Sequence, residues 1–349
     1  MTFFQLSEAN IIGTVIAFII GLFIVPLVIS FSEKQGLMDK PNERKIHSHP
    51  IPRLGGIAIW ICTILSFFAL ILLSYYPYRS LLSGLILGSS LMFFLGLIDD
   101  VYSLSAKFKF VLQISIATIV FFLGVKVTSI FIPFVGLISI PRILSYFLTI
   151  GWLVGISNAV NFIDGIDGLA GSVITISSVT LGILSIALIP NDVVIALVAF
   201  ILAGSMLGFL TYNFHPAKIF MGDSGALFSG FLLAALSVMY SMKLSDAKMY
   251  IPFLILAVPI IDITFSSLRR ILKGISPFVA DAEHIHHKLL NLGLSQNKAV
   301  LCLVVFSILM GLLATYISAS DTAKYFLYAV IISIVMIILN RHAKIGEGK

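Results

Sequence analysis

The sequence predicts an all-α, polytopic integral membrane protein with about eleven transmembrane helices in a single domain, residues 1–349. Two observations carry this prediction: 59% of the 349 residues are apolar and 11% are charged, and the apolar residues form long continuous runs. A soluble domain is about 25% charged, so the composition excludes a soluble enzyme, a disordered chain and a typical nucleic-acid-binding protein. A transmembrane β-barrel is excluded because its strands alternate apolar and polar side chains.

Each predicted helix is an apolar run near the roughly 20 residues that a membrane-spanning helix requires. Several of the loops between these runs are a few residues long, which leaves no room for a separate soluble domain. In chain order the runs cover residues 11–31, 56–76, 80–98, 108–126, 143–163, 168–189, 193–213, 224–241, 250–268, 299–319 and 323–340.

The basic residues of the loops predict how the chain crosses the membrane, because cytoplasmic loops are enriched in Lys and Arg. One alternate set of loops, with the C-terminal tail, holds 16 of the 22 Lys and Arg residues. We therefore expect this set to be cytoplasmic, the N-terminus to lie outside and the C-terminus to lie inside. The loops of the set are residues 32–55, 99–109, 214–223 and 269–298.

Most acidic residues fall on the same side of the predicted membrane. A transporter more often places such groups near the middle of the bilayer, and an unpaired charge inside a span costs roughly 2.5–3.5 kcal/mol. Clustering at one interface instead indicates chemistry on a water-soluble substrate. The acidic residues on this side include Asp99, Asp100, Asp164, Asp167, Asp223, Asp281 and Glu283.

Asp99 and Asp100 are adjacent carboxylates at the C-terminal end of an apolar run. The helix dipole disfavours anions at that end, so we expect a cation to compensate them. Mg²⁺, which prefers carboxylate oxygens, and the nearby Lys107 and Lys109 are the candidates. A solvated loop start is the simpler alternative.

The next polar stretch places Asn158, Asn161, Asp164 and Asp167 at a constant spacing of three. On a helix this spacing gives one slowly drifting stripe, and the glycines that follow let the backbone bend or admit a close ligand. Hydrogen bonding between helices is the alternative, which suits the two Asn residues but not the two Asp residues. The stretch is therefore predicted to be functional.

A third motif, residues 213–225, contains Phe220 and Asp223 just before the following helix. A carboxylate near the positive end of a helix is favoured there and can hold a metal ion. An N-cap role for Asp223 is compatible with metal binding. The aromatic ring of Phe220, in a loop, can stack on a base.

Two further segments are rich in positive or proton-binding groups. Arg270 with His284, His286 and His287 suits a pyrophosphate or a developing charge, and a zinc site is disfavoured because two of the histidines are adjacent and no thiolate is near. Arg53, beside two glycines, is predicted to contact phosphate, whereas a simple membrane anchor is the alternative for the rest of that loop. No nucleotide-binding P-loop, dinucleotide-binding fingerprint or G-x-S-x-G elbow is present.

Five motifs in this order resemble the polyprenyl-phosphate N-acetylhexosamine-1-phosphate transferases, a family that includes WecA, TagO and, more distantly, MraY. The resemblance spans residues 39–290, and its HIHH ending is similar to the WecA/TagO branch. The motifs are DKPNERKIHSHPIPRLGG, GLIDD with LSAKFK, NAVNFIDGIDGLAG, NFHPAKIFMGDSGA and RRILKGISPFVADAEHIHH.

The resemblance implies a reaction in which undecaprenyl phosphate attacks the β-phosphorus of UDP-GlcNAc, giving undecaprenyl-diphospho-GlcNAc and UMP. It further implies Mg²⁺, or Mn²⁺ in its place, a bacterial inner-membrane location with a cytoplasmic active site, and a role in starting a lipid-linked cell-envelope glycan such as lipopolysaccharide or teichoic acid. UDP-GalNAc and UDP-MurNAc-pentapeptide are alternative donors for the same reaction. A membrane transporter is the alternative function from another class. The resemblance also allows a homodimer.

The resemblance also implies roles for individual residues. Asp99 matches a base or activator of the lipid phosphate, Asp223 the strongest Mg²⁺ ligand and Asn161 a second ligand, although the division between base and ligand roles is open. The site predicted in this way comprises the metal ligands Asp223 and Asn161, the catalytic residues Asp99, Asp100, Asp164, Asp167, His284, His286 and His287, and the substrate-binding residues Arg53, Lys109, Asn158, Phe220 and Arg270.

Overall fold

The computed structural model describes residues 3–39, 49–72, 80–132, 135–190, 193–244, 246–274 and 284–319. The last predicted span, residues 323–340, lies outside these ranges. Residues 40–48 of the basic loop, which include Lys40, also lie outside the described ranges. So do residues 275–283 before the histidines, which include Asp281 and Glu283.

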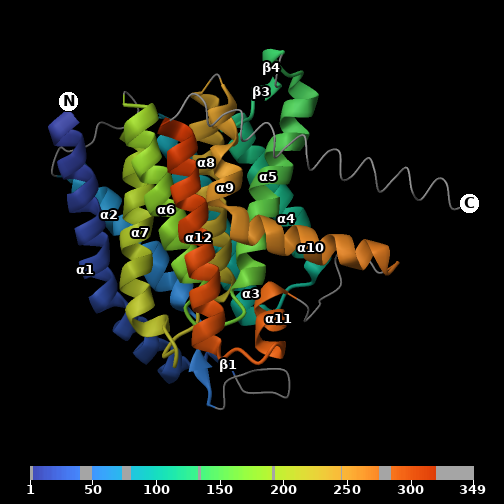
Figure 1. Ribbon diagram of the computed structural model, residues 1–349. Helices are drawn as coiled ribbons and strands as arrows, with labels where there is room; N and C mark the ends of the chain where they lie inside the picture. Colours follow the sequence, from blue (N-terminus) through green and yellow to red (C-terminus); the bar gives the residue numbers. More distant parts are fainter. Residues whose placement is uncertain are drawn as a thin grey trace, which may run out of the picture.

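Within these ranges the chain is a helical bundle (Figure 1). Eight helices are long and apolar enough to cross a membrane, and a bent pair adds a ninth, so the polytopic helical fold is confirmed while the count of eleven stays a prediction. The helices are α1 Phe3–Gln35, α2 Gly55–Leu72, α3 Ser80–Tyr102, α4 Ala106–Phe122, α5 Arg142–Ile163, α6 Leu169–Leu188, α7 Val193–Asn213, α8 Gly222–Met242, the 3-10 helix η1 Ala247–Tyr250, α9 Ile251–Ile255, α10 Ala257–Leu272, α11 Ile285–Asn291 and α12 Gln296–Ala319.

Helix α8 forms the centre of the bundle, with almost all of its side chains buried against α2, α3, α5 and α6. The outer helices α1 and α12 expose large apolar side chains such as Phe23 and Leu312. This arrangement suits a bilayer, because lipid chains solvate outward-facing apolar residues. The core therefore fixes α8, whose first turn carries Asp223.

Small residues let α1 and α7 pack closely. A Cβ atom on Gly208 would lie 2.9 Å from the Cα atom of Gly21, and one on Gly204 would lie 2.3 Å from the carbonyl oxygen of Thr14. Gly204 and Gly208 form a G-x-x-x-G pattern, which permits close approach of helices in membranes. The α1–α7 pair is one of the main contacts of the bundle.

The predicted span at residues 250–268 is bent in the structure, where the chain turns by 77° between α9 and α10. Pro259 has no N–H and cannot donate to the carbonyl of Ile255 four residues earlier, so the helical ladder is interrupted there. The Ser177 hydroxyl donates to that carbonyl at 2.9 Å. The bend thus leaves the Ile255 carbonyl satisfied in an apolar environment.

Helix α10 leaves the bundle sideways (Figure 1). Asp262, Ser266 and Arg270, four residues apart, are buried, whereas Phe265 and Leu268 are exposed. Residues four apart share one helical face, so α10 presents an apolar face outward and a polar face inward. Its buried polar face adjoins the histidine segment described below.

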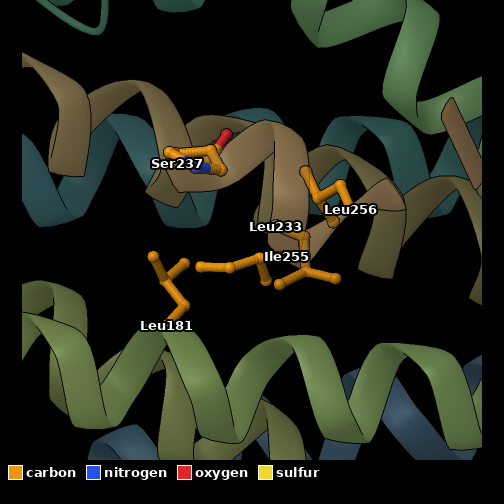
Figure 2. Close-up of a pocket in the computed structure, with 6 residues that line it drawn as sticks. Leu181, Leu233, Ser237, Ile255 and Leu256 are labelled. Atoms are coloured by element: carbon orange, nitrogen blue, oxygen red, sulfur yellow. The ribbon is translucent and has the colours of Figure 1, made fainter. Parts of the chain in front are cut away.

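The bend is tightly packed on the side that faces α6 and α8. Figure 2 shows the narrow gap between Leu181 of α6, Leu233 and Ser237 of α8, and Ile255 and Leu256 at the bend. The gap has no space for a water molecule. Contacts of apolar side chains therefore support the break at this point.

Two short antiparallel hairpins depart from the all-α prediction and lie at opposite ends of the bundle (Figure 1). In the first, β1 Met38–Asp39 pairs with β2 Ile51–Pro52, with Met38 opposite Pro52. In the second, β3 Ser129–Ile132 pairs with β4 Gly136–Ser139, with Ser129 opposite Ser139. Strands of two to four residues are too short to show a period in the sequence, which explains why they were not predicted.

Candidate active site

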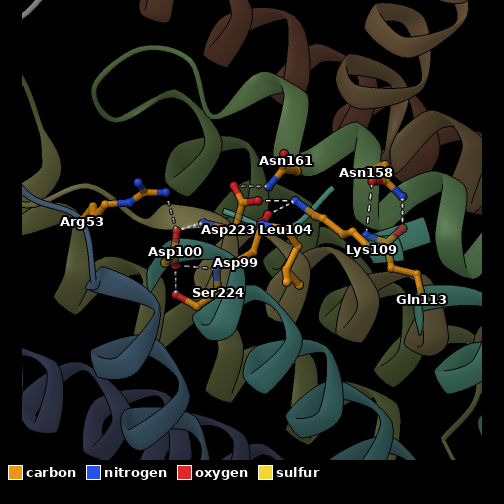
Figure 3. A network of polar contacts seen from close by, with 10 residues as sticks. All are labelled: Arg53, Asp99, Asp100, Leu104, Lys109, Gln113, Asn158, Asn161, Asp223 and Ser224. Atoms are coloured by element: carbon orange, nitrogen blue, oxygen red, sulfur yellow. Dashed lines mark hydrogen bonds and ion pairs between the residues drawn. The ribbon is translucent and has the colours of Figure 1, made fainter. Parts of the chain in front are cut away.

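The predicted polar residues gather at the end of the bundle that carries β1 and α11 (Figure 1). Helix α3 ends there with Asp99 and Asp100, α5 ends near Asn161, and α8 begins with Asp223. Figure 3 shows these side chains converging from three helices. The fold therefore joins motifs that are separated by more than 120 residues in the chain.

Lys109 of α4 connects two of these carboxylates. Its Nζ donates to Oδ2 of Asp99 at 2.7 Å and also to Oδ2 of Asp223. The backbone N–H of Leu104 donates to Asp99 at 2.6 Å, and Nδ2 of Asn161 donates to Asp223 at 3.0 Å. Because one ammonium group faces two carboxylates, this trio keeps a net negative charge and favours a further cation.

Of the two lysines that were candidate partners of Asp99 and Asp100, Lys109 makes the contact. Lys109 is largely buried within the trio, whereas Lys107 is exposed. The lysine at position 109 is placed by the first turn of α4, which Ser105 begins by accepting a hydrogen bond from the N–H of Phe108.

Asp100 has different hydrogen-bond partners from Asp99, the residue before it. Its Oδ1 accepts from Nη2 of Arg53 at 3.1 Å and from the N–H of Asp223 at 2.9 Å. Its Oδ2 accepts from the N–H and the hydroxyl of Ser224 at 3.0 and 2.7 Å. Asp100 thus binds the first turn of α8, a contact that the sequence did not predict because Ser224 lies 124 residues away.

Two loops are joined by backbone hydrogen bonds and bring Arg53 beside Phe220. The N–H of Phe220 donates to the carbonyl of Pro52 at 2.8 Å, and the N–H of Gly55 donates to the carbonyl of Phe220 at 2.9 Å. The N–H of Gly56 continues the pattern by donating to Met221. This pairing places the basic loop and the aromatic loop on one rim of the site.

Asp164 and Asp167 lie in the turn between α5 and α6. Asp167 accepts from Nδ1 of His215 at 2.7 Å and from the N–H of Ala217 at 3.1 Å, so it holds the loop that carries Phe220. Burial, followed by the charges of Asp223, Asp100 and Asp167, raises the pKa of Asp164 to about 8. Asp164 therefore lies in an excess of negative charge that a bound cation would relieve.

The histidines form a second cluster beside α10. Asp262 accepts from Nδ1 of His284 at 2.7 Å and from the N–H of Ile285 at 2.7 Å, which anchors the start of α11. His286 is buried, its Nε2 has no hydrogen-bond partner among the residues that the structure describes, and burial lowers its pKa to about 4. The sequence did not identify Asp262 as the partner, because it lies in what was predicted to be an ordinary span.

Asn158 connects two helices, and its substrate-binding role stays a prediction. Its Nδ2 donates to Oε1 of Gln113 at 2.7 Å, and Nε2 of Gln113 donates back at 3.3 Å. The pair joins α4 to α5 (Figure 3). Hydrogen bonding between helices, the alternative for this residue, accounts for its position.

A cavity of about 800 Å³ opens beside the cluster. This volume is within the roughly 300–1,000 Å³ of ordinary ligand sites. Asp99, Asp100 and Lys109 are not among the residues that line the cavity, but Lys109 contacts Asp223 and Asp100 contacts Arg53, which both line it. The predicted site residues that line the cavity are Arg53, Asn161, Asp164, Asp167, Phe220, Asp223 and His287, with His215 and Lys218 in addition.

The oxygen atoms at the cavity wall fit a hard divalent cation. Asp223 and Asn161 are hydrogen-bonded to each other and both line the cavity, with the acidic residue Asp164 close by. In the described part of the chain no three His, Cys, Asp or Glu side chains are grouped to enclose a metal by themselves. Such an incomplete donor set is typical of Mg²⁺, which is often held by one or two carboxylates together with substrate phosphates.

The fold and the site together define an integral membrane enzyme. A helical bundle with an apolar exterior carries, at one end, a cavity in which carboxylates, basic groups and an aromatic ring converge. Phosphoryl transfer depends on this combination of positioning and charge neutralisation.

Comparison with known proteins defines the enzyme further. The model of glycosyl transferase family 4 matches residues 82–241. A probable undecaprenyl-phosphate N-acetylglucosaminyl 1-phosphate transferase of Bacillus subtilis (strain 168) is 36% identical over 97% of this chain and 95% of its own length. A decaprenyl-phosphate N-acetylglucosaminephosphotransferase of Mycobacterium leprae (strain TN) is 35% identical over 86% of this chain and 81% of its own length.

A third relative, the undecaprenyl-phosphate alpha-N-acetylglucosaminyl 1-phosphate transferase of Escherichia coli (strain K12), is 29% identical over 82% of this chain and 78% of its own length. The chain belongs to glycosyl transferase family 4, the polyprenyl-phosphate N-acetylhexosamine-1-phosphate transferases. It is a glycosyl-1-phosphate transferase of the membrane, as the order of its motifs predicted.

Proposed function

We propose that this enzyme transfers N-acetylglucosamine 1-phosphate from UDP-GlcNAc to undecaprenyl phosphate, giving undecaprenyl-diphospho-GlcNAc and UMP. The observation that carries the proposal is the acidic cluster beside a cavity of about 800 Å³ at one end of an apolar bundle. The Bacillus subtilis relative, named for this reaction, aligns with nearly the whole chain. The product would begin a lipid-linked glycan of the cell envelope.

The donor would lie in the cavity. Arg53, Lys218 and His287 line it and supply donors for the two phosphates, while Phe220 offers its ring to the uracil. Asp223 and Asn161 would hold Mg²⁺, which supplies neutralisation of the phosphate charge when bound. Tight packing of the rim loops, including the Asp167–His215 contact, would orient the nucleotide.

The lipid phosphate would approach from the side of Asp99 and Lys109. One of its oxygens forms a bond to the β-phosphorus of the donor, and the bond from that phosphorus to the bridging oxygen breaks, so the electron pair leaves with UMP. Lys109, held by Asp99 at 2.7 Å, would orient the attacking phosphate. A proton still carried by that phosphate would pass to Asp99.

The membrane orientation belongs to the same proposal. We place the N-terminus outside, the C-terminus in the cytoplasm and the site on the cytoplasmic face of a bacterial inner membrane, with eleven spans. The excess of Lys and Arg in the loops on the site's side supports this orientation. Nucleotide sugars are water-soluble, so a site facing the cytoplasm has direct access to them.

The donor and the reaction class are tested in one assay. Membranes that contain the full chain are incubated with UDP-[¹⁴C]GlcNAc, Mg²⁺ and undecaprenyl phosphate, and we expect label in the butanol extract together with free UMP. Label from UDP-GalNAc or UDP-MurNAc-pentapeptide, but not from UDP-GlcNAc, would contradict the donor. A transporter would release no UMP at all.

A further inference from the structure

The carboxylate of Asp100 is saturated with hydrogen-bond donors. A carboxylate offers about four lone-pair positions, and Asp100 receives four donors: one guanidinium N–H, two backbone N–H groups and one hydroxyl. Its side chain is 0% exposed, whereas that of Asp223 is 27% exposed. Asp100 therefore has neither a free lone pair nor an open path for a metal ion or a substrate.

Three of the four donors that Asp100 receives come from the start of α8. The N–H groups of Asp223 and Ser224 belong to the first turn, whose amides have no partner within the helix itself. A negative charge at this end is favoured by the helix dipole. Asp100 thus acts as an N-terminal cap supplied by another helix, and it fixes the turn that carries Asp223.

The surrounding backbone is shaped for this contact. Gly222 has a φ of +71°, and a Cβ atom there would lie 2.7 Å from Oδ2 of Asp100. A Cβ atom on Gly96, one turn before Asp100 in α3, would lie 2.5 Å from the carbonyl oxygen of Asp223. Both glycines let α3 and α8 approach until the carboxylate reaches the amides.

We propose that Asp100 is a positioning residue, not a metal ligand or a base, and that it sets the geometry of Asp223 and Arg53 together. The proposal rests on the proposed function and corrects the catalytic role predicted for Asp100. Arg53 lines the cavity and is 33% exposed, so the same carboxylate orients a group expected to contact the donor and the helix turn expected to hold the metal. Asp99, the preceding residue, instead accepts from Lys109 and from the N–H of Leu104.

The test is a double-mutant cycle with D100N, S224A and D100N/S224A in the purified full chain. Ser224 is fully buried, and its hydroxyl donates to Asp100, so S224A weakens the cap without touching a metal ligand. We expect S224A to weaken Mn²⁺ binding, measured by electron paramagnetic resonance titration, about 3-fold, and D100N about 10–100-fold, as for other groups that orient a ligand.

The kinetics should follow the binding. The expected result is that kcat falls in parallel with Mn²⁺ affinity in both single variants. KM for UDP-GlcNAc should change less than about 3-fold in S224A, which keeps the Asp100–Arg53 contact, and should rise further in D100N, which weakens that contact. The double variant D100N/S224A should be no worse than D100N, because both changes act through one contact. The control is S205A, which removes a buried hydroxyl that accepts from Thr63 and donates to the carbonyl of Ile201, away from the site. It should match the wild type.

Two results would overturn the proposal. One is an S224A variant with wild-type Mn²⁺ affinity beside an inactive D100N, and the other is a double variant whose losses multiply. Either would mean that the carboxylate acts directly on the metal or the substrate. Failure of the wild type to release UMP would instead contradict the proposed function, and the Mn²⁺ titration would still report on Asp100.

Discussion

Asp223 is the residue on which the proposed chemistry most depends. It lines the cavity, contacts Lys109 and Asn161, and begins the central helix. Its neighbours leave it partly exposed, in contrast to Asp100, so its oxygen atoms are the ones available to a cation. Asp223 and Asp100 are the same residue type, so their different exposure follows from the hydrogen-bond partners around each carboxylate.

Replacing Asp223 with Asn should remove a charged oxygen from the metal site while keeping the volume of the side chain. We expect D223N to fold, to bind Mn²⁺ weakly and to lose at least about 100-fold in UMP release. The matched control is D246N, because Asp246 caps η1 at a distance from the site. Wild-type activity of D223N with an unchanged Mg²⁺ requirement would remove Asp223 from the metal role.

His286 should make the stability of the protein depend on pH. Its pKa is lowered to about 4 in the folded chain, against about 6.5 in an unfolded chain. The unfolded chain therefore binds more protons between these values, so the free energy of unfolding rises with pH from about 4 to 6.5. The stabilisation is present above pH 6.5 and is lost as the pH falls toward 4.

The measurement is the apparent melting temperature in detergent from pH 4.5 to 7. The H286F variant, which keeps a ring but cannot be protonated, should show a smaller slope than the wild type. The S205A variant, which loses no titratable group, serves as the control and should leave the slope unchanged. Equal slopes in the wild type and H286F would show that the burial of His286 does not penalise its charge.

Close packing of α1 against α7 depends on glycines that face each other. A Cβ atom on Gly208 would lie 2.9 Å from Gly21, so we expect G208A to destabilise the bundle by about 1–3 kcal/mol through overpacking. Gly155, in α5, has open space around it, and G155A should leave the stability within about 1 kcal/mol. Thermal unfolding in detergent compares the two, and equal melting temperatures would contradict the packing.

The apolar runs predicted the main helices because length and continuity are properties of the local sequence. Helix α7 begins and ends where its run does, at residues 193–213. The break at α9–α10 was not predicted, because Pro259 lies within an apolar run and its consequence depends on Ser177 of another helix. Hairpins of two to four residues were missed because they have no measurable period.

The sequence correctly predicted which site residues lie together where the reactive side chains belong to the motifs themselves. Asp99, Asp223 and Asn161 do converge, and Arg53 does lie beside Phe220. Asp100 and Asn158 were assigned from the same motifs, but their partners Ser224 and Gln113 belong to other helices. Pairing between distant segments decides whether a polar group faces the cavity or the interior, and one sequence does not contain that information.

The whole molecule separates two environments for two substrates. Its apolar exterior exposes residues such as Phe23 and Leu312 to lipid, while the cavity at one end carries charged and polar groups for the nucleotide sugar of the proposed reaction. Asp223 lines the cavity and contacts Lys109, the partner of Asp99. The central claim is therefore that a phosphorus–oxygen bond is exchanged where these environments meet.

The most direct measurement uses UDP-GlcNAc labelled with ³²P in the β-position, incubated with the detergent-purified full chain, Mg²⁺ and undecaprenyl phosphate. We expect the ³²P to pass into the butanol-extractable lipid while unlabelled UMP is released in equal amount. Retention of the ³²P in water-soluble UDP, with sugar alone transferred to the lipid, would contradict the account.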